Sequence, residues 1–154
     1  MLIELAWSEV SLAAEAGVHR RLRHMIKHTG DTYGYKDEDG WDIDIEACGA
    51  EMAVAKYLGV YWHDSGLPDS SDVGGFVGVR WTKHPKGHLL VYDRDSDQLA
   101  YALVTGRCPN LSILGWMWGH EAKEERFWKT DCREACFWVP CVDLRRPETL
   151  KTCQ

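Results

Sequence analysis

The sequence has no long apolar run and no excess of positive charge, and each absence narrows the class of protein. Apolar stretches such as residues 89–92 and 137–139 are far shorter than the roughly 20 residues that a membrane-spanning helix needs. The 18 Lys and Arg residues are outnumbered by 24 Asp and Glu residues, and the net charge is −6. A uniformly basic surface for nucleic acid is therefore excluded, and any such binding needs a local patch.

Motifs that mark several common classes of protein are also missing. The first residues, MLIEL, are not a basic leader followed by an apolar segment, so we expect a cytoplasmic protein without a secretory signal. The chain has no glycine-rich phosphate loop, no dinucleotide-binding fingerprint and no Ser-His-Asp order with a nucleophile elbow. The sequence therefore does not indicate a nucleotide-binding P-loop protein, a dinucleotide-binding enzyme or a serine hydrolase.

The composition is typical of one globular domain over residues 1–154. This length allows a full hydrophobic core and leaves little room for a second domain. Apolar residues make up 45% and charged residues 27% of the chain, which argues against disorder. We find no internal repeat and no low-complexity segment.

Two helices are predicted in the first part of the chain. Apolar residues recur at helical spacing over residues 8–28, with Ser8 as the N-cap. The Ala-rich segment 45–59 ends at a glycine and is expected to pack closely against a sheet. Residues 30–44 are rich in Gly, Asp and Tyr and are expected to form a loop. The acidic run 37–40 suggests a calcium loop, but the other ligand positions are missing and we reject an EF-hand.

The rest of the chain is predicted to be mostly strands. Residues 76–82 alternate, with positions 77, 79 and 81 on one face and positions 78, 80 and 82 on the other. Further elements are expected as strands at 88–93, 99–105 and 111–118, a short charged helix at 119–128, a returning strand at 137–140 and a helical turn near 147–150. Helices followed by a mostly antiparallel meander indicate a mixed α+β fold, with a central sheet of about four strands flanked by helices.

The densest group of basic side chains lies in the second half of the first helix. Residues 19–28 carry four fixed positive charges and three histidines. They form either a solvated helix face or a site that attracts phosphate. The chain also has eight tryptophans, which serve equally well as core residues, as anchors for a partner or as platforms for base stacking.

One set of residues indicates chemistry at a metal ion. Glu51 lies in the Ala-rich helix, Asp72 precedes the strand 76–82, and Arg80 belongs to that strand. A metal-dependent phosphodiesterase needs carboxylates that converge on a hard cation, and a cationic group that holds the phosphate. The structural alternative is that Glu51 is a solvated helix residue and that Asp72 forms a turn beside Gly74 and Gly75.

Five ordered blocks of the chain resemble a family of small bacteriophage and prophage proteins. The blocks are IEACGAEMAVAKYLG at 45–59, DVGGFVGVR at 72–80, LLVYDRD at 89–95, LVTG at 103–106 and GWMWG at 115–119. This resemblance extends over residues 7–139. The family in turn resembles the PD-(D/E)xK nuclease superfamily, which implies a restriction-endonuclease-like fold and a location in the bacterial host cytoplasm.

The resemblance also implies a reaction and a site. The reaction is hydrolysis of DNA phosphodiester bonds with Mg²⁺ or Mn²⁺. Asp72, Glu51 and the carbonyl of Val79 would hold the metal, while Arg80 and Lys83 would stabilise charge in the transition state. The phosphate contacts would come from Arg20, Arg21, Arg23, Lys27, Arg80 and Lys86.

Two positions depart from the superfamily pattern. Gly78 stands where Glu, Asp or Gln is typical, and Arg80 stands where Lys is typical. Arginine holds phosphate in a bidentate manner but does not give up its proton. A third carboxylate would have to come from Asp64, Asp69 or Asp93. The departures favour an alternative function, in which an inactive nuclease-fold module binds DNA or a host or phage protein.

Several cysteines and histidines provide a further hypothesis about metals. Some nucleases of the superfamily hold an iron–sulfur cluster with one upstream and three downstream cysteines, here Cys48 or Cys108 with Cys132, Cys136 and Cys141. The spacing differs from the usual pattern for such a cluster or for zinc, so we expect neither, and we predict buried thiols. His63 and His120 are expected to be ordinary surface residues.

Overall fold

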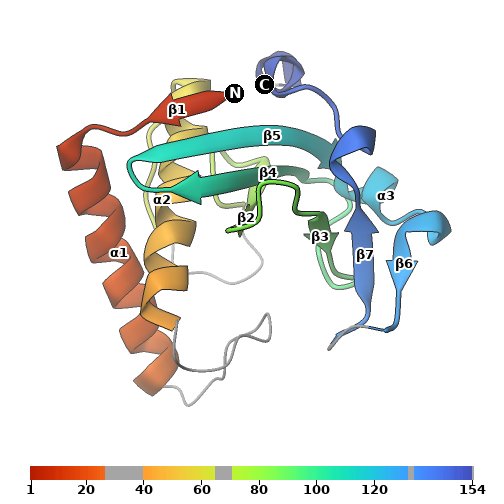
Figure 1. The fold of residues 1–154 in the computed structure, drawn as a ribbon, viewed down its shortest axis with the longest axis horizontal. Helices are drawn as coiled ribbons and strands as arrows, with labels where there is room; N and C mark the ends of the chain where they lie inside the picture. The colour runs from red at the N-terminus through yellow and green to blue at the C-terminus, as the bar shows by residue number, and fades with distance from the viewer. Residues whose placement is uncertain (27–39, 65–70, 132–133, 154) are drawn as a thin grey trace.

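The computed structural model describes residues 1–26, 40–64, 71–131 and 134–153, and in these parts the chain forms a mixed α+β structure. The helix α1 (Trp7–Ile26) lies beside α2 (Gly40–Leu58), and two sheets lie on the other side of α2 (Figure 1). Both long helices were predicted. Within these parts, no helix combines the length and the apolarity that crossing a membrane requires.

The first sheet contains four strands in the order β1-β5-β4-β2. Its members are β1 (Leu2–Glu4), β2 (Val77–Thr82), β4 (Ala100–Arg107) and β5 (Asn110–Trp118). β2 pairs with β4 in parallel, whereas the other two pairs are antiparallel. One face is covered by α2, where Val77 and Val79 belong to the same buried cluster as Ala50 and Val54. Because β2 is the last strand in the order, it forms one edge of this sheet.

Close packing between the two helices depends on a glycine in α1. A Cβ atom at Gly17 would lie 2.6 Å from the Cα atom of Ile45 in α2. The helix backbones approach so closely that no side chain fits between them. This contact fixes α1, and with it Arg20 one turn further along, against the second turn of α2.

The second sheet contains β3 (Leu89–Val91), β7 (Cys136–Val139) and β6 (Trp128–Lys129), in the order β3-β7-β6. Leu89, Val91 and Phe137 pack with Tyr101 and Leu103 of β4 in a second buried cluster. The predicted meander is wrong here, because β3 pairs with β7 and not with β2 or β4. A three-residue strand whose alternate side chains are buried specifies which face is covered, but not which strand lies beside it.

Other predicted boundaries also need correction. α2 begins at Gly40, so residues 40–44 are helical and do not belong to a loop. The helix expected at 119–128 is divided into α3 (Gly119–Ala122) and a 3₁₀ turn (Glu125–Phe127). Ala122 and Phe127 are both buried. Five residues apart on a straight α-helix they would point roughly 140° from each other, so one continuous helix does not bury both in the same cluster.

The C-terminal part has further short elements. The 3₁₀ turns are Cys141–Asp143 and Pro147–Cys153, and the second includes the helical turn predicted near residue 147. Its Leu150 is fully buried in the first cluster. The chain end therefore packs on the first sheet, against β5.

Candidate functional site

A cavity of about 880 Å³ brings the predicted site residues together. It runs along the edge strand β2, between α2 and the second sheet. Charged residues from four segments line it: Arg20 of α1, Glu51 of α2, Asp72 and Arg80. Val79 and Lys86 also line it, whereas Lys83 is exposed and is not part of the lining.

Asp72 is held at the edge of β2 by a tight turn. Its backbone N–H and that of Val73 both donate to the Val77 carbonyl, at 2.8 and 3.0 Å. Gly74 and Gly75 between them have φ angles of 62° and 81°, which favour glycine. The turn folds the Asp72 carboxylate back, so that its Oδ2 accepts a 2.6 Å hydrogen bond from the Val79 N–H. The Asp72 carboxylate thus accepts a backbone N–H of the edge strand that a neighbouring strand would otherwise bind.

Glu51 is a buried carboxylate, with 5% of the residue exposed. Arg20 donates to both of its oxygens, at 2.8 and 3.1 Å, and the Trp62 indole N–H donates to Oε2 at 3.2 Å. Burial raises the pKa of Glu51 and outweighs the lowering effect of Arg20, while the nearby Asp72 charge raises it further. The solvated helix residue considered as an alternative is therefore wrong for Glu51.

Asp72 and Glu51 influence each other electrostatically. Burial also raises the pKa of Asp72, against the lowering effects of the Val79 N–H and of Arg80. Two carboxylates with raised pKa values that face one cavity are stabilised by a cation between them. Mg²⁺ suits such a donor set, because proteins usually hold it with one or two carboxylates together with water and substrate phosphate.

Asp64 belongs to an arginine network and does not supply a third carboxylate to the cavity. It accepts from Arg20 at 3.0 Å and from Arg23 at 2.5 Å. Burial acts to raise the pKa of Asp64, but the hydrogen bonds from the two arginines hold this pKa below its ordinary value. Asp93 does not line the cavity either, and Asp69 lies outside the described residues.

The basic half of α1 does not present all its charges on one open face. Arg20 lines the cavity and Arg23 is paired with Asp64, as described above. Arg21 is buried, and its guanidinium lies where a Cβ atom at Gly40 would be. Lys27 is outside the described residues. Of the predicted phosphate contacts, Arg20, Arg80 and Lys86 therefore share the cavity.

Arg80 is fixed by contacts that the sequence did not reveal. Its Nη2 donates to Asp95 Oδ2 at 2.7 Å, its Nε to the Leu90 carbonyl and its Nη1 to the Val79 carbonyl, both at 3.3 Å. The guanidinium carbon lies 4.9 Å from the centre of the Tyr101 ring. In the sequence, the alternating aspartates at 93, 95 and 97 are the signal that could have indicated this turn as a partner of a charged group.

The Tyr101 ring also explains the glycine at position 78. A Cβ atom at Gly78 would lie 2.6 Å from Tyr101 Cε1, so the ring occupies the space of a side chain there. A carboxylate side chain at position 78 does not fit beside Tyr101. Among the described residues, Glu51 and Asp72 are therefore the two carboxylates that line the cavity.

We predict that Gly78→Ala lowers the free energy of unfolding by about 1–3 kcal/mol, the usual cost of overpacking. Alanine normally favours a strand over glycine, so a loss shows that the contact with Tyr101 dominates. Urea denaturation measures the effect. In a Tyr101→Ala background the same substitution should cost much less, and an equal cost in both backgrounds would contradict this explanation.

Aromatic residues also line the cavity. Trp138 of β7 pairs across the second sheet with Leu90, and both line the cavity. Trp138 is 36% exposed, and the His88 ring lies 5.5 Å from it. Its indole N–H donates to Cys136 Sγ, which fixes the ring orientation. The cavity thus joins a charged region to an aromatic surface.

The cysteines and histidines that the structure describes form no second metal centre. Cys48 and Cys136 are buried, and Cys108 and Cys141 are half-buried. Cys132 and the side chain of Cys153 lie outside the described parts. Among the described residues, no group of three or more His, Cys, Asp or Glu side chains is arranged to hold a metal. His63 and His120 are exposed, as expected.

Comparisons with protein-family models, with curated proteins and with solved structures found no match to the chain.

Proposed function

We propose that this protein is a Mg²⁺- or Mn²⁺-dependent nuclease of the PD-(D/E)xK type that hydrolyses DNA phosphodiester bonds. The observation that carries the proposal is the convergence of Glu51, Asp72 and Arg80 from three separate segments on one cavity. Carboxylates beside a fixed guanidinium suit a reaction in which a phosphate gains negative charge.

Each residue has a distinct role in this proposal. Asp72 is the main metal ligand, because Oδ2 is fixed by the Val79 N–H while Oδ1 has no hydrogen-bond partner among the described residues. Glu51 acts beside it, directly or through a bound water, since Arg20 holds both of its oxygens. A bound Mg²⁺ supplies an acidified water and neutralises phosphate charge. Arg80 holds a phosphate oxygen, with Arg20 and Lys86 as further cationic groups in the cavity.

The size and the lining of the cavity favour a strand with unstacked bases. A volume of about 880 Å³ is in the range of pockets that enclose small molecules. The exposed Trp138 face offers a stacking surface for one base. We therefore propose single-stranded DNA, or a strand end, as the substrate that reaches the carboxylates.

The second candidate function is a nuclease-fold module that binds nucleic acid or a protein without cleaving it. Two observations favour it, namely the Tyr101 ring in place of a third acidic side chain and the bidentate pairing of Glu51 with Arg20. Incubation of single-stranded and duplex DNA with the protein and Mg²⁺, Mn²⁺ or EDTA separates the two. Metal-dependent cleavage, faster on the single strand, supports the nuclease; DNA binding without cleavage supports the module.

Metal binding is predicted to stabilise the protein in a manner that depends on pH. Because burial raises the pKa values of Asp72 and Glu51 above the ordinary value of roughly 4, protons compete with the metal, and binding should be stronger at about pH 8 than at about pH 5.5. Mn²⁺ at roughly 100 times its Kd would add about 2.7 kcal/mol to the free energy of unfolding. Thermal unfolding with and without Mn²⁺ measures this at each pH. A stabilisation that is equal at both pH values, or that persists in Asp72→Asn, would contradict the prediction.

A further inference from the structure

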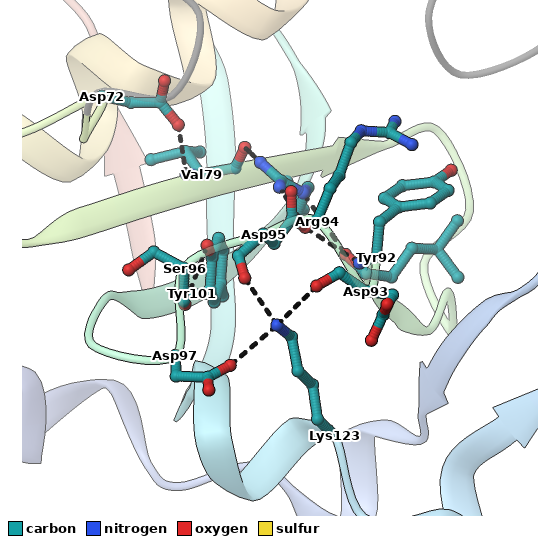
Figure 2. A network of polar contacts seen from close by, with 12 residues as sticks. Asp72, Val79, Tyr92, Asp93, Arg94, Asp95, Ser96, Asp97, Tyr101 and Lys123 are labelled. Atoms are coloured by element: carbon teal, nitrogen blue, oxygen red, sulfur yellow. Dashed lines mark hydrogen bonds and ion pairs between the residues drawn. The ribbon is translucent and has the colours of Figure 1, made fainter.

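The turn between β3 and β4 surrounds a positive charge. Asp93, Asp95 and Asp97 alternate along this turn, a pattern that in other proteins often surrounds a metal ion. Here the ammonium of Lys123 lies among their oxygens (Figure 2). It donates to the carbonyls of Asp93 and Asp95, at 2.8 and 2.6 Å, and pairs with Asp97 Oδ1 at 2.7 Å. All three ammonium hydrogens therefore have an oxygen partner.

Lys123 is held in this place by the packing of α3. A Cβ atom at Gly119 would lie 2.2 Å from the Ser96 carbonyl oxygen, so the helix start touches the turn directly. Backbone hydrogen bonds from Gly119 to Leu99 and from His120 to Asp97 add to this contact. The Lys123 side chain is 15% exposed, whereas that of Asp97 is 62% exposed. The contact with the Asp95 carbonyl is part-buried, whereas the contact with the Asp93 carbonyl is exposed to water, like the Asp97 side chain of the ion pair.

The same turn fixes Arg80 in two ways. Asp95 Oδ2 accepts from the Tyr92 N–H at 2.9 Å and from Arg80 at 2.7 Å. The Ser96 carbonyl accepts from the Tyr101 hydroxyl at 3.2 Å, and the Tyr101 ring is the surface on which the Arg80 guanidinium lies. Lys123 itself does not line the cavity. Its influence on Arg80 must pass through the turn.

We propose that Lys123 is a positioning residue, whose ammonium replaces a metal ion at the centre of this turn and thereby holds Arg80 in the cavity. Without the ammonium, two backbone carbonyls and the Asp97 carboxylate would face each other without a counter-charge. The turn would then open, and both the Asp95 carboxylate and the Tyr101 ring would lose their fixed positions. The consequence for catalysis rests on the proposed function, but the consequence for the Arg80 side chain does not.

The test follows the Arg80 Nε–H by ¹⁵N NMR, with the resonance assigned by its loss in Arg80→Lys. In Lys123→Met, which keeps the unbranched stem of the side chain but removes the ammonium and its charge, we expect exchange of this proton with water to rise at least about tenfold. Metal-dependent kcat should fall by a similar factor, with KM nearly unchanged. The control is Arg107→Ala, which removes an ion pair with Asp42 whose side chains are both 63% exposed, and it should change neither value.

Chemical rescue separates positioning from general damage. Propylammonium should restore slow exchange of the Arg80 Nε–H in Lys123→Ala, where it has room to bind, but not in Lys123→Met. If Lys123→Met does not fold, the proposal is supported when Lys123→Ala folds only in the presence of propylammonium. Unchanged exchange in folded Lys123→Met, or an amine that restores neither folding nor slow exchange, overturns it. A wild-type protein that cleaves no DNA would refute the nuclease function and leave the NMR result to decide this inference.

Discussion

Asp72→Asn is expected to reduce metal-dependent DNA cleavage by at least about 100-fold. Loss of several kcal/mol of transition-state stabilisation corresponds to this factor, since about 1.4 kcal/mol is tenfold. Asparagine keeps an oxygen that can accept from the Val79 N–H, so the turn at the edge of β2 should survive. The substitution therefore removes the charge that binds the metal and leaves the local fold. Initial rates on a single-stranded substrate, over a range of Mn²⁺ concentrations, measure the effect.

A matched control tests whether the effect belongs to this position. Asp143→Asn makes the same chemical change at a residue whose ion pair with Arg126 has a long N–O distance of 3.8 Å. Asp143 does not line the cavity, and its variant should cleave like the wild type. Equal cleavage by wild type and Asp72→Asn would remove Asp72 from the mechanism. The same comparison made in EDTA gives the background for all three proteins.

The sequence predicted the secondary structure well wherever local periodicity decides it. Residues 76–82 and 111–118 nearly coincide with β2 and β5, because alternation along a strand reports which face is buried. Strand pairing was less predictable. β1 was missed because three residues carry too little periodicity, and β3 was assigned to the wrong sheet because burial of Leu89 and Val91 does not identify the neighbouring strand.

The candidate site was predictable in its parts but not in its partners. The helix position of Glu51, the turn that links Asp72 to β2 and the strand position of Arg80 all followed from local sequence. The partners are distant in the chain: Arg20 lies 31 residues from Glu51, and Asp95 lies 15 residues from Arg80. Such pairs are created by tertiary packing, and a single sequence contains no periodic signal for them.

The contrast between the two arginines shows how these partners shape the site. Arg80 is held mainly by the turn at Asp95 and by the Tyr101 ring. Its three hydrogen bonds described above go to Asp95 and to two backbone carbonyls, and none of them goes to Glu51 or Asp72. Arg20 instead binds Glu51 directly and neutralises it. Arg80 is therefore the better candidate for contact with substrate, and Arg20 for maintenance of a buried charge.

Arg20→Met is expected to lower the free energy of unfolding by about 3–5 kcal/mol near pH 8, the usual cost of leaving a buried charge without its partner. Burial raises the pKa of Glu51 even with Arg20 present, and loss of the guanidinium should raise it further. The folded variant then binds a proton more tightly than the unfolded chain does. This contribution to stability is fully present below the ordinary pKa of Glu and is lost as pH rises through the raised pKa. Urea denaturation at several pH values should therefore show a smaller loss near pH 5 than near pH 8.

Two further variants identify the cause of this loss. Adding Glu51→Gln to Arg20→Met removes the unpaired charge and should recover much of the stability at pH 8, because replacing both partners of a buried pair costs far less than removing one. Lys56→Met breaks the more exposed ion pair with Glu9 and should cost no more than about 1 kcal/mol. If Arg20→Met loses the same free energy at both pH values and the double variant recovers nothing, the effect comes from lost packing of the arginine side chain. Glu51 would then not be the charged group that Arg20 stabilises in the cavity.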